Sequence, residues 1–125
     1  MFPYQKTSIN TFKFGECYTG EQFNKKAQDI KFIKILMRDM KHYNFQYTID
    51  TVNVDTNQFC PEDTCRPGGL YFCDIRYFWN FLSYGEIIVD VKIPDDARVY
   101  VDKGKYKADK IFITNAQINV SMFPN

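Results

Sequence analysis

Residues 65–94, CRPGGLYFCDIRYFWNFLSYGEIIVDVKIP, carry the strongest fold signals in the chain. The stretch opens with a proline and two glycines, which is typical of a turn. Residues 70–73 then predict a short strand, and Asp74 is a good N-cap for a helix. Gly85 stands where a helix commonly ends, and residues 86–93 alternate apolar and polar side chains as a half-buried strand does. The side chains expected on one face of the helix are Ile75, Phe78, Trp79 and Leu82.

The flanking residues predict further strands and one more helix. Thr19 and Gln22 have the spacing of a capping box, so a helix is expected over residues 20–29. Residues 45–49 alternate apolar and polar side chains, which predicts a strand after a polar turn. Residues 55–69 predict a long loop because they are rich in Pro, Gly, Asp and Thr. Later strands are expected at 99–101, 111–113 and 117–120, the first two joined through a glycine loop and the last at a sheet edge.

Residues 31–38 are compatible with two structures. Their apolar side chains continue the spacing of the preceding helix, and their β-branched and aromatic content fits a buried strand equally well. The pattern alone leaves both open. The lysines in and before this segment are expected on a solvated face: Lys25, Lys26, Lys31 and Lys34.

Length and composition describe one ordinary domain. The chain has 125 residues, 45% of them hydrophobic and 18% aromatic, so rings should fill much of the core. A formal net charge of +1 argues against a partner held through nucleic-acid phosphates, and no apolar run is long enough to span a membrane. The first residues lack a signal-peptide pattern. We therefore expect a reducing cytoplasm, in which the four cysteines stay thiols.

Four residues near the glycine turn are candidates for a ligand site, namely Gly68, Gly69, Tyr71 and Trp79. Two adjacent glycines permit positive φ angles or the close approach of a ligand to the backbone. The two rings offer a stacking surface. The alternative is a glycine turn that simply leads into a core strand.

Cysteine and histidine spacing gives a weak metal signal. Cys60, Cys65, Cys73 and His42 are ligand types that zinc prefers, but structural zinc sites show two tight pairs and this chain has one loose pair. Cys73 is expected to be a core thiol and His42 a surface histidine. Cys60 and Cys65 are expected to be free thiols, and the alternative is a disulfide between them. No catalytic set is recognisable, so we predict no metal, no cofactor and no catalytic residue.

Several separated motifs resemble one family of viral proteins. They are Phe45-Gln-Tyr47, Asn53-Val-Asp55, Phe59, Cys65-x-Pro-Gly-Gly-Leu-Tyr-Phe-x-Asp74, Tyr84-Gly85, Ile93-Pro94, Ala97-x-Val-Tyr100 and Lys107-Ala-Asp-Lys-Ile111. This ordered series, within residues 31–114, is similar to the N-terminal domain of ankyrin-repeat proteins of giant DNA viruses of the mimivirus and megavirus kind, and to their stand-alone relatives. In that family the segment matching 31–37 is a strand, which favours a strand here. The resemblance implies a viral source and no reaction. This chain departs from the longer members in showing no ankyrin repeat, and residues 50–52 lack the glycine expected there.

A weaker likeness concerns Gly68-Gly-Leu-Tyr-Phe-Cys-Asp74 and the strand over residues 86–91, which look like the corresponding segment of ADP-ribosyltransferase-type domains. That likeness would place Tyr71 against nicotinamide. The His-Gly motif that binds NAD in that family is absent before it, and the catalytic glutamate has no clear counterpart.

Together these features predict one α+β domain over residues 1–125, with a mainly antiparallel sheet of six or seven strands and two helices, and with residues 1–18 loosely attached. The expected function is a non-enzymatic protein-interaction module of the infected cell. Its expected partner is a viral, host or identical protein rather than nucleic acid or membrane, and its expected location is the host cytoplasm, the viral factory or the virion. The alternative is a small-molecule or nucleotide-binding domain with a degenerate ADP-ribosyltransferase-like fold.

Overall fold

The computed structural model describes residues 12–42, 44–57, 59 and 68–119. Its largest element is an antiparallel sheet with the strand order β1-β8-β9-β6-β2-β7-β10-β5. The strands are β1 (Cys17–Thr19), β2 (Phe32–Leu36), β5 (Thr51–Val54), β6 (Leu70–Asp74), β7 (Ile87–Lys92), β8 (Arg98–Val101), β9 (Lys105–Ala108) and β10 (Lys110–Ile118). A separate hairpin joins β3 (Lys41–His42) to β4 (Phe45–Gln46), and the helices are α1 (Gly20–Lys26) and the 3₁₀ helix η3 (Ile75–Tyr84). The predicted α+β class with a mainly antiparallel sheet is confirmed.

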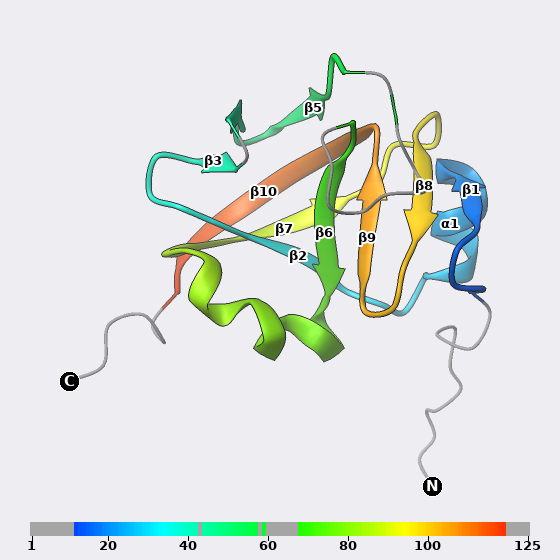
Figure 1. The fold of residues 1–125 in the computed structure, drawn as a ribbon, viewed down its shortest axis with the longest axis horizontal. Helices are drawn as coiled ribbons and strands as arrows, with labels where there is room; N and C mark the ends of the chain where they lie inside the picture. Colours follow the sequence, from blue (N-terminus) through cyan, green and yellow to red (C-terminus); the bar gives the residue numbers. More distant parts are fainter. Residues whose placement is uncertain (1–11, 43, 58, 60–67, 120–125) are drawn as a thin grey trace, which may run out of the picture.

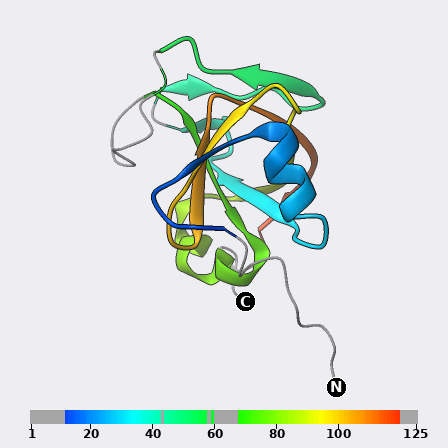
Figure 2. The same ribbon diagram turned by 90° about the vertical axis from the view of Figure 1, so that its right-hand side faces the viewer.

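The large sheet is strongly twisted, and its two halves enclose the core. In Figure 1, β6, β8 and β9 run nearly vertically, whereas β2, β7 and β10 cross behind them obliquely. Figure 2 shows α1 against one side of the sheet, the short β3, β4 and β5 strands at its upper end, and η3 at its lower end. Both halves supply buried side chains, among them Phe72, Val99 and Tyr106 from one and Phe32, Val91 and Ile111 from the other.

The ring of Phe23 links α1 to both halves of the sheet. This fully buried side chain lies 5.0 Å from the ring of Phe32 and 5.5 Å from that of Tyr106, measured between ring centroids. The predicted capping box starts the helix, because the hydroxyl of Thr19 accepts from the backbone N–H of Gln22 and the side chain of Gln22 accepts from that of Thr19. The helix ends at Lys26, three residues earlier than expected.

The strand over residues 31–37 is confirmed as β2, which lies in the middle of the sheet between β6 and β7. All five of its residues are buried. The expectation that Lys34 belongs to a solvated lysine face is therefore wrong, since this side chain is only 4% exposed. Burial follows from its position on a central strand that is covered on both faces.

The helix predicted after Asp74 forms with a different pitch. Asp74 is its N-cap and accepts from the backbone N–H of Arg76, as expected. The helix is a 3₁₀ helix with three residues per turn, so side chains chosen on a 3.6-residue period do not share one face. Trp79 is 71% exposed, and Ile75 is 37% exposed. Gly85 follows the helix, as expected. Only glycine fits at this position, because a Cβ there would overlap the backbone of Leu36.

Three strand predictions need correction. Residues 105–108 form β9, although their lysines and the preceding Gly104 suggested a loop. The strand expected over 45–49 is reduced to β4, which pairs with β3 where a polar turn was expected. Residues 117–118 end β10, which lies between β7 and β5, rather than forming a separate edge strand. No helix in the described part of the chain is long and apolar enough to cross a membrane.

Candidate functional site

The Gly68–Gly69 turn packs against the carboxylate of Asp55 and the aliphatic part of the Lys107 side chain. Both glycines have positive φ, 106° and 144°, as the sequence predicted. The backbone N–H of Gly69 donates to the carboxylate of Asp55 at 2.8 Å. A Cβ on Gly69 would lie 2.5 Å from Cγ of the fully buried Lys107, so a protein side chain makes the close approach that we had considered for a ligand.

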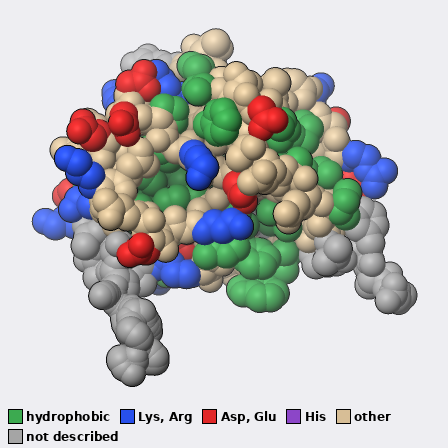
Figure 3. All heavy atoms as spheres, turned by 180° about the vertical axis from the view of Figure 1, so that it is seen from behind, with side chains coloured by type: hydrophobic (Ala, Val, Ile, Leu, Met, Phe, Trp, Pro, Cys, Tyr) green, Lys and Arg blue, Asp and Glu red, His purple; other side chains and the backbone are tan. Residues whose placement is uncertain are grey.

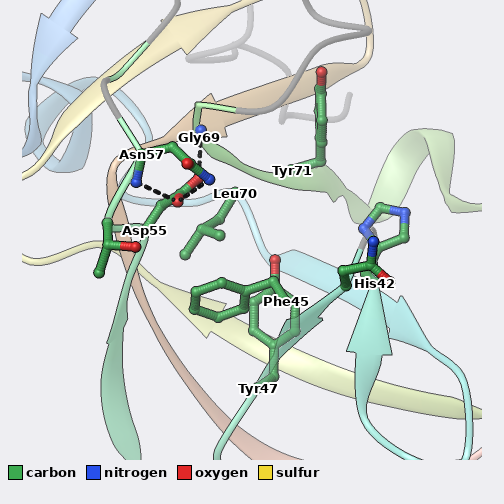
Figure 4. A pocket seen from close by; sticks show the side chains of 10 residues that line it. His42, Phe45, Tyr47, Asp55, Asn57, Gly69, Leu70 and Tyr71 are labelled. Carbon is green, nitrogen blue, oxygen red and sulfur yellow. Dashed lines mark hydrogen bonds between the residues drawn. The ribbon is translucent and has the colours of Figure 1, made fainter.

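A pocket of about 230 Å³ lies beside this turn (Figure 4). It is lined by His42, Asn44, Phe45, Tyr47, Asp55, Thr56, Asn57, Gly69, Leu70 and Tyr71. Figure 4 shows Asp55 and Asn57 on one side, His42 and Tyr71 toward the other, and the side chains of Leu70 and Phe45 between them. The walls therefore combine aromatic rings with hydrogen-bonding groups, which is the usual make-up of a small-molecule site.

Lys34 lies behind one wall of the pocket. Its Nζ is 3.2 Å from Nδ1 of His42 and 4.9 Å from the ring centroid of Tyr47. It also donates to the backbone carbonyl of Tyr71. The ladder between β2 and β6 ends at the pair of Ile33 with Cys73, so the amine of Lys34 reaches the Tyr71 carbonyl where the two strands are no longer paired.

Burial sets the protonation of these groups. It lowers the pKa of Lys34 to about 7, because the charged amine loses its hydration, and the nearby Cys73 opposes this only in part. Burial also lowers the pKa of His42 to about 4, with the charge of Lys34 acting in the same direction. The pKa of Tyr47 is raised well above its usual value by burial and by the charge of Asp55. At neutral pH the imidazole and the phenol are therefore uncharged.

A second buried polar group stands at the far end of β6. The carboxylate of Asp74 is fully buried and accepts from the hydroxyl of Tyr106 at 2.6 Å and from Nη2 of Arg76 at 2.7 Å. Burial and this hydrogen bond raise the pKa of Tyr106. Since the Asp74 carboxylate has charged and neutral donors, it ties η3 to the sheet.

The structure separates the four predicted site residues. Gly69 and Tyr71 line the pocket, and Gly68 is buried in the same turn. Trp79 is on η3 and is not part of the pocket wall. Whether these residues bind a ligand stays a prediction.

Sequence reasoning missed the contributions of His42, Asp55 and Lys34. Asp55 carried a usable signal, because it belongs to one of the motifs quoted above. His42 was expected at the surface, but it is half-buried against Lys34. A lysine between isoleucines looks the same in sequence whether it is solvated or buried.

The zinc ligands considered from the sequence divide between described and undescribed residues. Cys60 and Cys65 lie outside the described residues. Cys73 is a buried thiol whose pKa is raised to about 12 by burial, as a core cysteine would be. Among the residues that the structure describes, no group of three or more His, Cys, Asp or Glu side chains is arranged to hold a metal ion.

Comparison with known proteins finds relatives in a giant virus. The chain is 33% identical over 93 residues to a protein of Acanthamoeba polyphaga mimivirus that is named as an ankyrin repeat protein, a match that covers 74% of this chain and 27% of that protein. Two further proteins of that virus with the same kind of name are 37% and 34% identical over 67 and 91 residues, and the matches cover 52% and 66% of this chain and 33% and 15% of those proteins.

The chain thus spans a third or less of the length of these three relatives. No family model matches it, and no solved structure matches it. The resemblance predicted from the separated motifs is confirmed, and this chain is related in sequence to the mimivirus-type ankyrin-repeat proteins.

Proposed function

We propose that the domain is a protein-interaction module that acts in the infected cell, in the host cytoplasm, the viral factory or the virion. The observation that carries the proposal is a set of exposed hydrophobic side chains on and around η3, here called the η3 patch. It consists of Met37, Ile75, Trp79, Tyr84 and Ile118. Ankyrin repeats, for which the relatives are named, are interaction scaffolds.

Packing at Gly85 brings three members of the η3 patch to one place. Met37 follows Leu36, whose backbone lies against Gly85, and Tyr84 precedes that glycine. Ile118 precedes Asn119, whose side-chain amide donates to the carbonyl of Gly85. Figure 3 shows hydrophobic side chains standing out at the lower margin of the molecule, where η3 lies. Exposed apolar groups of this kind mark contact surfaces.

The aromatic side chains of η3 are suited to anchoring a partner. The ring of Trp79 stacks on that of Phe78 at 4.8 Å between centroids, so it is held in place while it remains 71% exposed. A pre-ordered tryptophan loses little conformational freedom on binding and is enriched among the residues that dominate interface energies.

A photocrosslinking experiment tests the proposal. A photoreactive phenylalanine analogue replaces Trp79 in one protein and Phe14, which is 61% exposed, in a matched control. In extract from virus-infected cells, position 79 should give a discrete adduct that position 14 does not. Excess unlabelled wild type should compete for it, and excess Trp79→Ala protein should not. Equal labelling from both positions, or equal competition by both proteins, would contradict the proposal.

A second candidate function is small-molecule or nucleotide binding in the pocket beside Gly69 and Tyr71. The pocket itself supports it, together with the weaker likeness to ADP-ribosyltransferase-type domains. Amide NMR spectra recorded during titration with NAD test it. Shifts that saturate at Gly69 and Tyr71, and that are reduced in Tyr71→Ala, would support this role, whereas shifts spread over distant strands would not.

A further inference from the structure

Lys34 is a buried cation whose contacts within the described residues are all to neutral groups. Its Nζ meets Nδ1 of His42, the carbonyl of Tyr71 and the ring of Tyr47. None of the ion pairs found between described residues includes it. Buried lysines are ordinarily paired with an acid, because an ammonium without counter-charge is unfavourable inside a protein.

The pocket lies directly beside this cation. All three residues that contact Lys34 also line the pocket. The carboxylate of Asp55, toward the other side in Figure 4, already accepts from three N–H groups, those of the Gly69 backbone and of the Asn57 backbone and side chain. The negative charge within the pocket wall is thus bound by donors, while the ammonium of Lys34 behind it has no acidic partner among the described residues.

Further positive charge surrounds Tyr71. The Nζ atoms of Lys105 and Lys107 lie 5.6 and 5.4 Å from the centroid of its ring. Both lysines are on β9, which pairs with β6 beside Tyr71. Two further lysine side chains thus place their ammonium groups near Tyr71.

The contact between Lys34 and His42 also determines which ring nitrogen carries hydrogen. An ammonium group can only donate, so Nδ1 of a neutral His42 must accept from it and the hydrogen must be on Nε2. Whenever Lys34 is charged, the hydrogen of a neutral His42 is therefore on Nε2.

We propose that the pocket binds a small organic carboxylate with a flat apolar body, and that its binding is coupled to the uptake of one proton by Lys34. The inference rests on the second candidate function above. The carboxylate would supply a counter-charge to Lys34, which has none among the described residues. The body would pack against Phe45 and Leu70, which line the same pocket. A neutral or cationic molecule of the same shape would not gain the interaction with the charge of Lys34.

The groups that face Lys34 do not titrate with it. His42 on β3 has its pKa lowered to about 4, and Cys73 on β6 has its pKa raised to about 12, both chiefly by burial. Burial also raises the pKa of Tyr47. Asp74, whose charge acts on Cys73, is held by other donors. Of these described groups with shifted pKa values, Lys34, with a pKa of about 7, is the one that changes charge around neutral pH.

Calorimetric titration with benzoate, benzamide and benzylammonium tests the proposal on the intact protein. Benzoate should bind at least tenfold more tightly than the other two probes at pH 7. Its affinity should fall about tenfold per pH unit above pH 7, because the competent form of Lys34 becomes that much rarer. In buffers of different ionisation enthalpy, binding at pH 8 should take up close to one proton.

Two variants separate this inference from the pocket's general role. Lys34→Met should abolish both the proton uptake and the preference for benzoate, while Lys92→Met, at an exposed lysine of β7, should change neither. The anion site would be refuted if benzamide bound as tightly as benzoate, or if Lys34→Met left the affinity for benzoate unchanged. In either case the pocket would still be a ligand site. No saturable binding of benzoate, or no shift of the Gly69 and Tyr71 amides with it, would also refute the inference, while NAD shifts at those amides would still support the pocket.

Discussion

Replacing Lys34 with methionine should remove most of the pH dependence of stability between pH 7 and 9. Methionine keeps the length and the aliphatic stem of the side chain but cannot ionise. It also leaves the Tyr71 carbonyl and the His42 ring without their donor. The absolute stability of the variant therefore combines two opposing effects. The pH dependence isolates the ionisation, because the methionine side chain has no proton to gain or lose.

The sign and size follow from the shift in pKa. The ordinary value of 10.5 applies to the unfolded chain, and the folded protein has a value of about 7. Between these values the unfolded chain binds a proton that the folded protein does not, so the free energy of unfolding rises with pH by about 1.4 kcal/mol per unit. From pH 7 to pH 9, Lys34 therefore raises the free energy of unfolding by about 2 kcal/mol. This is slightly less than twice the slope per pH unit, because near pH 7 half of the folded molecules still carry the proton.

Urea denaturation of both proteins at pH 7, 8 and 9 measures this effect. The stability difference between wild type and Lys34→Met should change by about 2 kcal/mol across the range, in favour of wild type at pH 9. Other titrating groups, such as Cys73, are common to both proteins and cancel in that difference. Parallel pH profiles, within about 0.5 kcal/mol, would show that Lys34 stays protonated when buried and would refute the argument.

Four further substitutions test the glycine turn and the Asp74 network by denaturation. Gly69→Ala should cost about 2 kcal/mol or more, because it places a Cβ against the stem of Lys107 at a positive φ. Gly15→Ala should cost about 1 kcal/mol, because φ is also positive there but the nearest atom to its Cβ is the Tyr100 hydroxyl at 4.0 Å. Equal losses would show that the Lys107 contact is easily relieved. Asp74→Asn should cost about 2 kcal/mol through its buried donors, and Tyr106→Phe about 1, since it removes a single hydrogen bond to the same carboxylate. A loss below about 0.5 kcal/mol in Asp74→Asn would contradict a stabilising role for this network.

The parts of the fold that were predictable from sequence are those where local pattern and burial agree. The strand over residues 86–93 alternates cleanly, and the buried Val89 and Val91 confirm its facing in β7. The capping box at Thr19 and the cap at Asp74 are local signals that depend on a few neighbouring atoms. β2 was ambiguous by pattern, and the family resemblance decided it correctly.

The missed features depend on contacts between distant segments. β9 has two lysines, and its strand conformation comes from pairing with β6 and β8 rather than from propensity. The exposure of Trp79 depends on the 3₁₀ pitch of η3, for which a 3.6-residue face is the wrong template. Of the pocket residues, only Gly69 and Tyr71 were predicted from the sequence. His42 belongs to β3 and Asp55 directly follows β5. Both are distant in sequence from the glycine turn, and only the fold brings them to it.

The motifs on which the viral resemblance was predicted build the frame of the pocket, while the η3 patch lies largely outside them. Asn53 ties the turn before β5 to Thr48, and Asp55 holds the glycine turn. Of the η3 patch, only Tyr84 belongs to those motifs, and its ring lies 6.4 Å from that of His42. The two surfaces should therefore act independently, apart from this one contact. Trp79→Ala should leave benzoate affinity unchanged within twofold, and Lys34→Met should leave photocrosslinking from position 79 unchanged. If either substitution altered both readouts, the contact between His42 and Tyr84 would be the path to examine, and an interaction module with a separate ligand site would no longer describe this domain.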